Sequence, residues 1–235
     1  MGPTDYKSLS PELLAEFSAG AGHDLNNPLA AISGRVQMML REESDPAKRA
    51  DLAIILTQVK RAQEMIADLR LTSRPPKPQK SEILFKDFLE NLRQSWADAF
   101  REQNVEFLVN GPADLYINAD KTQMMVLFRA LIKNALRALG GAGFIRIAWE
   151  VPSEGRVKIL VSDSGPGIPQ EIRPLIFDPY FSSYQSGRGL GFGLTKARII
   201  AQMHGGDVTL DESARETTFV VELGYSSGSG SIPSP

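Results

Sequence analysis

The chain has 235 residues, 42% of them hydrophobic, and a formal net charge of −2. That length leaves room for one or two domains, the near-neutral charge argues against a nucleic-acid or polyanion binder, and the lack of cysteine excludes disulfides, thiolate metal sites and a cysteine nucleophile. No apolar run approaches the roughly 18 residues of a membrane span, and no signal-peptide pattern is present, so a cytoplasmic segment without membrane contact is expected.

Residues 1–74 predict two helices joined by a tight turn. The first runs from an N-cap at about Ser10 to about Glu42, and the second opens with Asp45 as N-cap and Pro46 at the first helical position. Apolar residues recur at steps of three and four along the first helix, at Leu14, Phe17, Ala21, Leu25, Pro28, Ile32, Val36 and Met39. A heptad seam follows the second helix, at Leu52, Ile55, Val59, Ala62, Ile66 and Leu69.

One such hairpin has too little core to be stable alone. Both helices also carry apolar residues outside these faces, such as Leu13, Met38, Ile54 and Met65. Two chains that pair their hairpins would bury these residues in a four-helix bundle, which predicts a homodimer. The alternative is that the hairpin packs against the rest of its own chain.

Residues 75–80, rich in proline, predict a stiff linker to a second domain at residues 81–224. In that domain the sequence predicts helices at 88–103, 121–139 and 190–203, and strands at 144–151, 156–163, 208–210 and 217–223. Helices and antiparallel hairpins in this order predict a two-layer α+β sandwich. Residues 225–235 are of low complexity and predict a flexible tail.

His23 lies on the opposite side of the first helix from Ala21 and the rest of the apolar face, at about 100° of rotation per residue. A neutral imidazole nitrogen is a nucleophile near pH 7, and the carboxylate of Asp24 can accept its other N–H or take its proton. Asn27 shares this face one turn later, and Pro28 removes a helical N–H, which predicts a bend. The pattern indicates either a reactive histidine or an idle exposed one beside a polar cap.

Two glycine-rich segments follow predicted elements of the second domain. Asp163 ends a strand and is followed by Gly165 and Gly167. The carboxylate can accept a hydrogen bond from an exocyclic amine, and the glycines let the backbone approach a flat ring. The alternative is an ordinary turn, which has the same composition. A second cluster at residues 187–193 opens a helix, where backbone N–H groups form an anion site suited to phosphates. Its spacing matches neither a P-loop nor a dinucleotide fingerprint.

Asn134 is an amide within an otherwise apolar helix. Its carbonyl oxygen is suited to hold Mg²⁺ beside phosphate oxygens, although a lone asparagine in a helix is also a common surface residue. Between the two glycine segments, residues 178–188 contain the glycine and serine expected of a lid over a ligand.

Taken in order, the segments Gly22–Leu29, Leu131–Arg137, Asp163–Pro169, Phe177–Ser183 and Gly187–Leu194 resemble the H, N, G1, F and G2 boxes of sensor histidine kinases of two-component systems. The resemblance covers about residues 10–223, and the H box is most similar to that of the nitrogen-regulation branch. It implies a dimerisation and histidine phosphotransfer hairpin followed by an ATP-binding domain of the Bergerat (GHKL) fold.

The resemblance also implies roles for single residues. His23 would accept the phosphoryl group, Asp24 would be its general base, and Asn27 would position water when the enzyme acts as a phosphatase. Asn134 would hold Mg²⁺ and Asp163 would bind the amino group of adenine. The other implied nucleotide contacts are the base-pocket glycines Gly165 and Gly167, the phosphate-binding segment Gly189, Leu190, Gly191 and Gly193, and the cations Lys133 and Arg137.

The implied activity is transfer of the γ-phosphoryl group of ATP to His23, and from there to an aspartate of a response-regulator receiver domain. One position departs from the family pattern, because Ala130 stands where a second asparagine is frequent; ATP-hydrolysing relatives such as gyrase have a water-activating glutamate there. The alternatives are an enzyme that acts mainly as a phosphatase and a non-catalytic dimeric scaffold that binds nucleotide.

Overall fold

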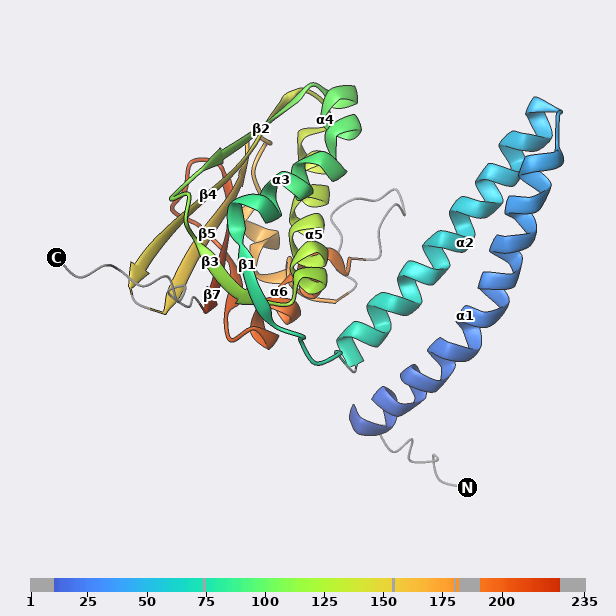
Figure 1. The fold of residues 1–235 in the computed structure, drawn as a ribbon, viewed down its shortest axis with the longest axis horizontal. Coiled ribbons are helices and arrows are strands. Elements are labelled where there is room, and N and C mark those ends of the chain that lie inside the picture. The colour runs from blue at the N-terminus through green and yellow to red at the C-terminus, as the bar shows by residue number, and fades with distance from the viewer. Residues whose placement is uncertain (1–10, 74, 154, 180, 182–190, 225–235) are drawn as a thin grey trace. The chain divides into compact units, whose positions relative to one another are not determined.

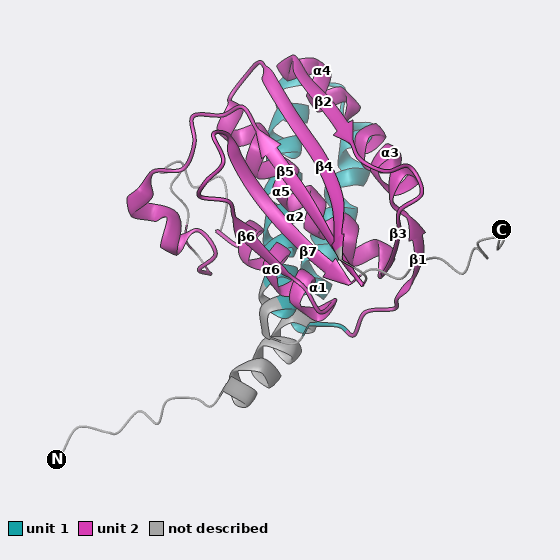
Figure 2. Cartoon of the chain, turned by 90° about the vertical axis from the view of Figure 1, so that its left-hand side faces the viewer, with its two compact units in different colours: residues 1–76 teal, residues 77–235 magenta. Residues whose placement is uncertain are grey.

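The computed structural model describes residues 11–73, 75–153, 155–179, 181 and 191–224, and the side chains of the first helix from Asp24 onward. The chain forms two compact units, residues 1–76 and 77–235 (Figures 1 and 2). The first unit is helical and the second is an α/β sheet unit, which confirms the predicted fold classes. Over the described residues, no helix is both apolar enough and long enough to cross a bilayer.

The first unit is a helical hairpin of α1 (Pro11–Glu42) and α2 (Pro46–Ser73). Asp45 caps α2 as predicted, because its Oδ1 accepts a hydrogen bond of 2.9 Å from the N–H of Ala47. Arg49 closes the turn by donating from Nη1 to the carbonyl oxygens of Leu40 and Glu43, at 2.6 and 2.9 Å. Both helices therefore begin and end close to the predicted residues.

Half of the predicted apolar residues whose side chains are described are exposed in a single hairpin. Val36, Leu52 and Val59 are buried where the two helices meet, but Leu25 and Ile32 remain 53% and 45% exposed. The side chains of Leu14, Phe17, Ala21 and Leu69 lie outside the described residues. The hairpin therefore presents an apolar surface that its own two helices do not cover.

The second unit contains two sheets and the helices that pack on the larger one. In chain order its elements are β1 (Ser81–Leu84), α3 (Phe85–Ser95), α4 (Ala97–Gln103), β2 (Val105–Asn110), β3 (Tyr116–Ala119), α5 (Lys121–Leu139), β4 (Gly143–Ser153), β5 (Arg156–Asp163), the 3-10 helix η1 (Gln170–Leu175), α6 (Gly193–Met203), β6 (Asp207–Leu210) and β7 (Thr217–Gly224). The larger sheet has the order β2-β4-β5-β7-β6, with β2 and β4 parallel and the other neighbours antiparallel. Strands β1 and β3 form a separate antiparallel pair.

The helices α3, α5 and α6 lie on one face of the five-stranded sheet (Figures 1 and 2). Alternation along the strands turns buried residues such as Ile145, Ile147 and Ile159 toward these helices. No described helix of the second unit covers the opposite face, which we call the open face. The core is therefore a two-layer sandwich, as predicted.

Helix α5 occupies the predicted residues because its ends are capped. The side chain of Asp120 accepts hydrogen bonds from the N–H groups of Thr122 and Gln123, at 2.9 and 3.1 Å. At the other end Gly140 adopts a left-handed φ of 62°, which stops the helix. Between the caps, Phe128 is fully buried and joins an aromatic cluster with Phe85.

Two predicted helices differ from the structure. The single helix expected at 88–103 is wrong: it is broken at Trp96, so that Phe100 on α4 stacks on Phe107 of β2 at 5.2 Å. The helix expected at 190–203 begins only at Gly193, because Gly191 has a φ of +73°, which a right-handed helix cannot contain. The strands β1, β2 and β3 were not predicted.

A chain of hydrogen bonds connects the start of the second unit to the helices α5 and α6. Asp120 Oδ2 accepts from the N–H of Gln79 at 2.8 Å, and the N–H of Asp120 donates to His204 Nε2 at 3.0 Å. His204, just after α6, is buried, and its Nδ1 lies 2.8 Å from the carbonyl oxygen of Ile200. Burial lowers the pKa of His204, which favours the neutral ring whose Nε2 accepts.

Gly206 is expected to be essential to the stability of the second unit. A methyl group at Gly206 would overlap the carbonyl oxygen of Glu222 on β7, and neither backbone can move without breaking strand pairing. Gly206→Ala should lower the free energy of unfolding by about 2 kcal/mol or more. Both tryptophans, Trp96 and Trp149, belong to this unit, so their fluorescence during urea unfolding measures it directly.

The matched control is Gly141→Ala, because a methyl group there would meet nothing within 4 Å. Its unfolding midpoint should stay close to that of the unsubstituted chain. Equal midpoints for the two variants would contradict the expected overlap at Gly206.

Candidate functional site

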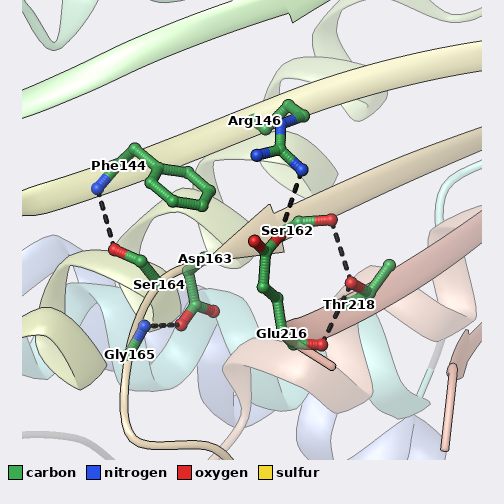
Figure 3. A network of polar contacts seen from close by, with 8 residues as sticks. All are labelled: Phe144, Arg146, Ser162, Asp163, Ser164, Gly165, Glu216 and Thr218. Atoms are coloured by element: carbon green, nitrogen blue, oxygen red, sulfur yellow. Dashed lines mark hydrogen bonds and ion pairs between the residues drawn. The ribbon is translucent and has the colours of Figure 1, made fainter. Parts of the chain in front are cut away.

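The end of β5 places a buried carboxylate at one edge of the sheet. Asp163 is 1% exposed, and its Oδ1 accepts a hydrogen bond of 2.9 Å from the N–H of Gly165 (Figure 3). Burial raises the pKa of Asp163 to about 6; the bond from Gly165 opposes this rise, and the negative charge of Glu216 adds to it. The Asp163 carboxyl group therefore changes charge within one unit of neutral pH.

The loop after β5 approaches helix α5 at a glycine. A Cβ atom at Gly165 would lie 2.6 Å from Asp163 Oδ1 and 3.2 Å from the Cβ of Ala138, so a larger residue would push into the site. Two positions further, Gly167 has a φ of +86°, a conformation that side chains disfavour. The role of both glycines as the wall of a base pocket stays a prediction.

Helix α5 brings Asn134 to the same region. Asn134 is half-buried and lies one turn before Ala138, the residue that packs against Gly165. Lys133 and Arg137 are exposed and lie one turn apart on the neighbouring face of the helix. The structure thus places Asn134 one turn from the residue that meets the Asp163 loop, and the two cations at the surface.

The start of α6 provides the second glycine segment. Gly191 has a left-handed φ of +73° and Gly193 is the first helical residue, so the first backbone N–H groups of the helix follow it. Thr195 Oγ1 donates to the carbonyl oxygen of Phe177 at 2.9 Å, which fixes this turn to the segment after η1. Gly189 and Leu190, and nearly all of the predicted lid, lie outside the described residues.

Two residues near Asp163 were not predicted from the sequence. Thr217 is the cross-strand partner of Asp163, and its buried Oγ1 has no hydrogen-bond partner among the described residues. The hydroxyl is nonetheless close enough to the Asp163 carboxylate to oppose the rise of its pKa. Glu216 precedes it and forms an ion pair of 3.0 Å with Arg146. The pairing of β5 with β7 creates these contacts, and no local motif signals them.

In the hairpin, the backbone of His23 is part of α1, and its side chain lies outside the described residues. The side chains of Asp24 and Asn27 are exposed. Asp24 is adjacent to His23, and Asn27 lies one helical turn after it, so all three belong to one stretch of the helix. Their catalytic roles stay a prediction.

Two family profiles match the chain. Residues 13–77 match the His Kinase A (phospho-acceptor) domain, and residues 119–227 match the family described as histidine kinase-, DNA gyrase B-, and HSP90-like ATPase. The chain therefore belongs to the sensor histidine kinases of two-component systems. The likeness of its H box to the nitrogen-regulation branch stays a prediction.

Two of the similar proteins are histidine kinases by name. The signal transduction histidine-protein kinase AtoS of Escherichia coli (strain K12) is 32% identical over 196 residues, which are 83% of this chain and 32% of AtoS. The chain thus spans about a third of that relative. The catalytic domain of histidine kinase ThkA is 28% identical with a TM-score of 0.56, over 63% of this chain and 98% of that domain.

Two larger solved structures share the fold over most of the chain. Full-length ShkA in complex with AMPPNP has a TM-score of 0.77 at 18% identity, over 90% of this chain and 46% of that one. ThkA in complex with the response regulator protein TrrA has a TM-score of 0.64 at 25% identity, over 91% of this chain and 62% of that one. The architecture of both units is therefore that of known histidine kinases.

Proposed function

We propose that this chain is the kinase core of a two-component sensor, which transfers the γ-phosphoryl group of ATP to His23. The observation that carries the proposal is the buried Asp163 carboxylate at the end of β5, held by Gly165 beside the glycine wall. Such a carboxylate accepts a hydrogen bond from the amino group of adenine, and its burial strengthens that bond. The match of residues 119–227 to an ATPase family supports the same ligand.

In the proposed reaction a ring nitrogen of His23 attacks the γ-phosphorus in line with the leaving oxygen. The bond to the bridging oxygen breaks, ADP leaves, and Asp24 takes the proton displaced from the imidazole. Mg²⁺, when bound, neutralises the phosphate charge. Asn134 fits this ion as an oxygen donor, since its half-buried amide lies one turn from the residue that contacts Gly165.

Phosphate contacts are proposed for the start of α6 and for exposed cations. The backbone of Gly191 and Gly193 leads into the first turn of that helix, where N–H groups lack helical partners. Gly189 and Leu190 complete this segment in the proposal. Lys133 and Arg137 are placed at the surface, where they can attract phosphate oxygens.

The proposed partners are a second copy of the chain and a response-regulator receiver domain. The exposed apolar residues of the hairpin, Leu25 and Ile32 among them, support a homodimer because a second hairpin would bury them. The complex of ThkA with TrrA supports a receiver as phosphoryl acceptor. A cytoplasmic location is part of the proposal, because the proposed phosphoryl donor is ATP.

Incubation of the chain with γ-labelled ATP and Mg²⁺ tests the function. Label that is stable to base and labile to acid is expected, because phosphohistidine has this behaviour and phosphoserine does not. Nucleotide binding without any incorporation would support the non-catalytic scaffold instead.

A second activity, dephosphorylation of the same receiver, is supported by the exposed side chain of Asn27 one turn after His23. Its amide can orient water toward a receiver phosphate. Comparing autophosphorylation with the loss of label from a phosphorylated receiver separates the two activities. Asn27→Ala should reduce only the second.

ATP affinity should weaken below about pH 6, because protonation of Asp163 removes the charged acceptor for the adenine amine. Phosphate groups also titrate near pH 6. The ratio of the dissociation constants of the Asp163→Asn variant and the unsubstituted chain, measured by calorimetry from pH 5 to 8, cancels that contribution. A ratio that does not change with pH would contradict a titrating role for Asp163.

A further inference from the structure

An ion pair on the open face of the sheet lies beside the proposed adenine site. Arg146 on β4 donates from Nη1 to Oε2 of Glu216 at 3.0 Å, and both side chains are a little over a third exposed (Figure 3). The guanidinium also lies over the ring of Phe144, 4.7 Å from its centroid. Arg146 is therefore held from two sides, and it has a fixed orientation toward Glu216.

The backbone around this pair is tied to both sides of Asp163. On the β7 side, Glu216 directly precedes Thr217, the cross-strand partner of Asp163. On the β4 side, Phe144 donates its N–H to Ser164 Oγ at 2.9 Å, and its carbonyl oxygen accepts from the Ser164 N–H at 3.2 Å. The ion pair therefore spans the two strands that flank the buried carboxylate.

The polar contacts behind the pair fix its position further. Thr218 Oγ1 lies 2.9 Å from Ser162 Oγ and also donates to the carbonyl oxygen of Glu216 at 3.2 Å. The backbone of Glu216 is therefore anchored to β5 one residue before Asp163. Only the side chain of Glu216 can still rotate, and the ion pair with Arg146 restricts that rotation.

We propose that Arg146 and Glu216 are positioning residues of the nucleotide site, in which the guanidinium holds and neutralises the Glu216 carboxylate so that Asp163 remains charged for the adenine amine. The inference rests on the proposed function, because it assigns Asp163 to adenine. It adds a pair that the histidine kinase motifs of this sequence do not contain.

Among the charged groups near Asp163, Glu216 is the one whose effect on the titration of Asp163 can be tested by substitution. Burial is the main cause of the raised pKa of Asp163; the bond from Gly165 opposes the rise, Glu216 just before β7 adds to it, and Thr217 opposes it. From α5 the residue packed against the loop is Ala138, which carries no charge. From β4, Arg146 pairs with Glu216 and shares the face of its cross-strand partner Ser162, which is the face opposite to Asp163.

Removing one partner at a time should move the titration of Asp163 in opposite directions. Arg146→Gln leaves Glu216 unpaired, so the pKa of Asp163 should rise, whereas Glu216→Gln removes the negative charge and should lower it. A shift of about half a unit each way is expected for one partly screened charge, or roughly threefold in the ratio of ionised to protonated carboxyl. The double variant should resemble Glu216→Gln, since Arg146 acts through Glu216.

The measurement is the titration of the Asp163 carboxyl carbon by NMR in the chain without nucleotide, followed by the pH profile of ATP affinity for each variant. Glu150→Gln and Lys158→Gln are matched controls, because they alter the ion pair of 3.8 Å at the other ends of β4 and β5. Five residues along β5 separate Lys158 from Asp163, about 16 Å, so that charge is screened. Both controls should leave the titration unchanged.

Opposite shifts in the two single variants, reproduced in the ATP profiles, would support the proposal. Shifts in the same direction, or none, in folded variants would overturn it. Because the NMR titration needs no nucleotide, such a failure is distinguishable from failure of the proposed function, which would appear as absent ATP binding in the unsubstituted chain.

Discussion

Replacing Asp163 with asparagine should weaken ATP binding while making the nucleotide-free second unit more stable at neutral pH. The loss of affinity is expected to be roughly ten- to hundredfold, since a hydrogen bond to a charged acceptor is replaced by one to a neutral amide. The introduced amide keeps an oxygen that accepts a hydrogen bond from the N–H of Gly165. It also gains an N–H₂ group that can donate to Oγ1 of Thr217. The asparagine therefore keeps its hydrogen bonds within the protein but makes a weaker one to the amino group of adenine.

The gain in stability follows from the raised pKa of Asp163. The carboxyl has an ordinary value of 3.8 and a value of about 6 in the folded chain, so the folded state binds the proton more tightly than the unfolded state. That stabilisation is complete below pH 3.8 and is lost as the pH rises to about 6, a difference of about 3 kcal/mol. At pH 7 the chain thus carries a buried charge that the variant lacks.

Urea unfolding followed by tryptophan fluorescence at pH 7 and pH 4 measures this effect. The asparagine variant should be the more stable at pH 7, and the gap should close at pH 4. A variant less stable than the unsubstituted chain at pH 7 would contradict the stated charge burial. Unchanged ATP affinity in calorimetry would contradict the adenine contact.

Replacing His23 with glutamine should abolish incorporation of label from γ-labelled ATP and leave ATP affinity unchanged. The side chain keeps its polarity but has no nucleophilic nitrogen, and the residue lies in a different compact unit from Asp163. The measurement is scintillation counting of the chain together with calorimetric titration of ATP.

The chain contains only one other histidine, His204, and its position makes it a poor acceptor. It is buried, and both of its ring nitrogens lie within hydrogen-bond distance of backbone groups. Arg35→Gln, an exposed change on the same helix, is the control and should retain the label. Acid-labile label that persists in His23→Gln would overturn the assignment of the acceptor.

Elements with strong local signals were predictable to within a few residues. Proline at the first helical position and an aspartate cap fix the start of α2, and Asp120 and Gly140 bound α5 from both sides. The short strands β1 and β3 have no comparable signal. The break at Trp96 also lacks one, because it depends on packing of Phe100 against β2, which is set by tertiary structure.

The candidate site also contains residues with a local sequence signal and residues that only tertiary structure brings together. Asp163, Gly165 and Gly167 lie in one contiguous motif, so residue type and order were enough to select them. Thr217 and Glu216 come near Asp163 only because β7 pairs with β5 in a particular register. A single-residue slip would place different side chains there, and nothing in the local sequence specifies that register.

The bonds that link Gln79, Asp120 and His204 make one aspartate common to three segments of the second unit. The same carboxylate that caps α5 also anchors the last residues of the proline-rich segment, and the adjoining amide is anchored by the imidazole after α6. The two carboxylate oxygens divide this work, because Oδ2 accepts from Gln79 and Oδ1 caps α5. Loss of the Asp120 side chain should therefore free the start of α5 and Gln79 together, while the backbone bond to His204 remains available.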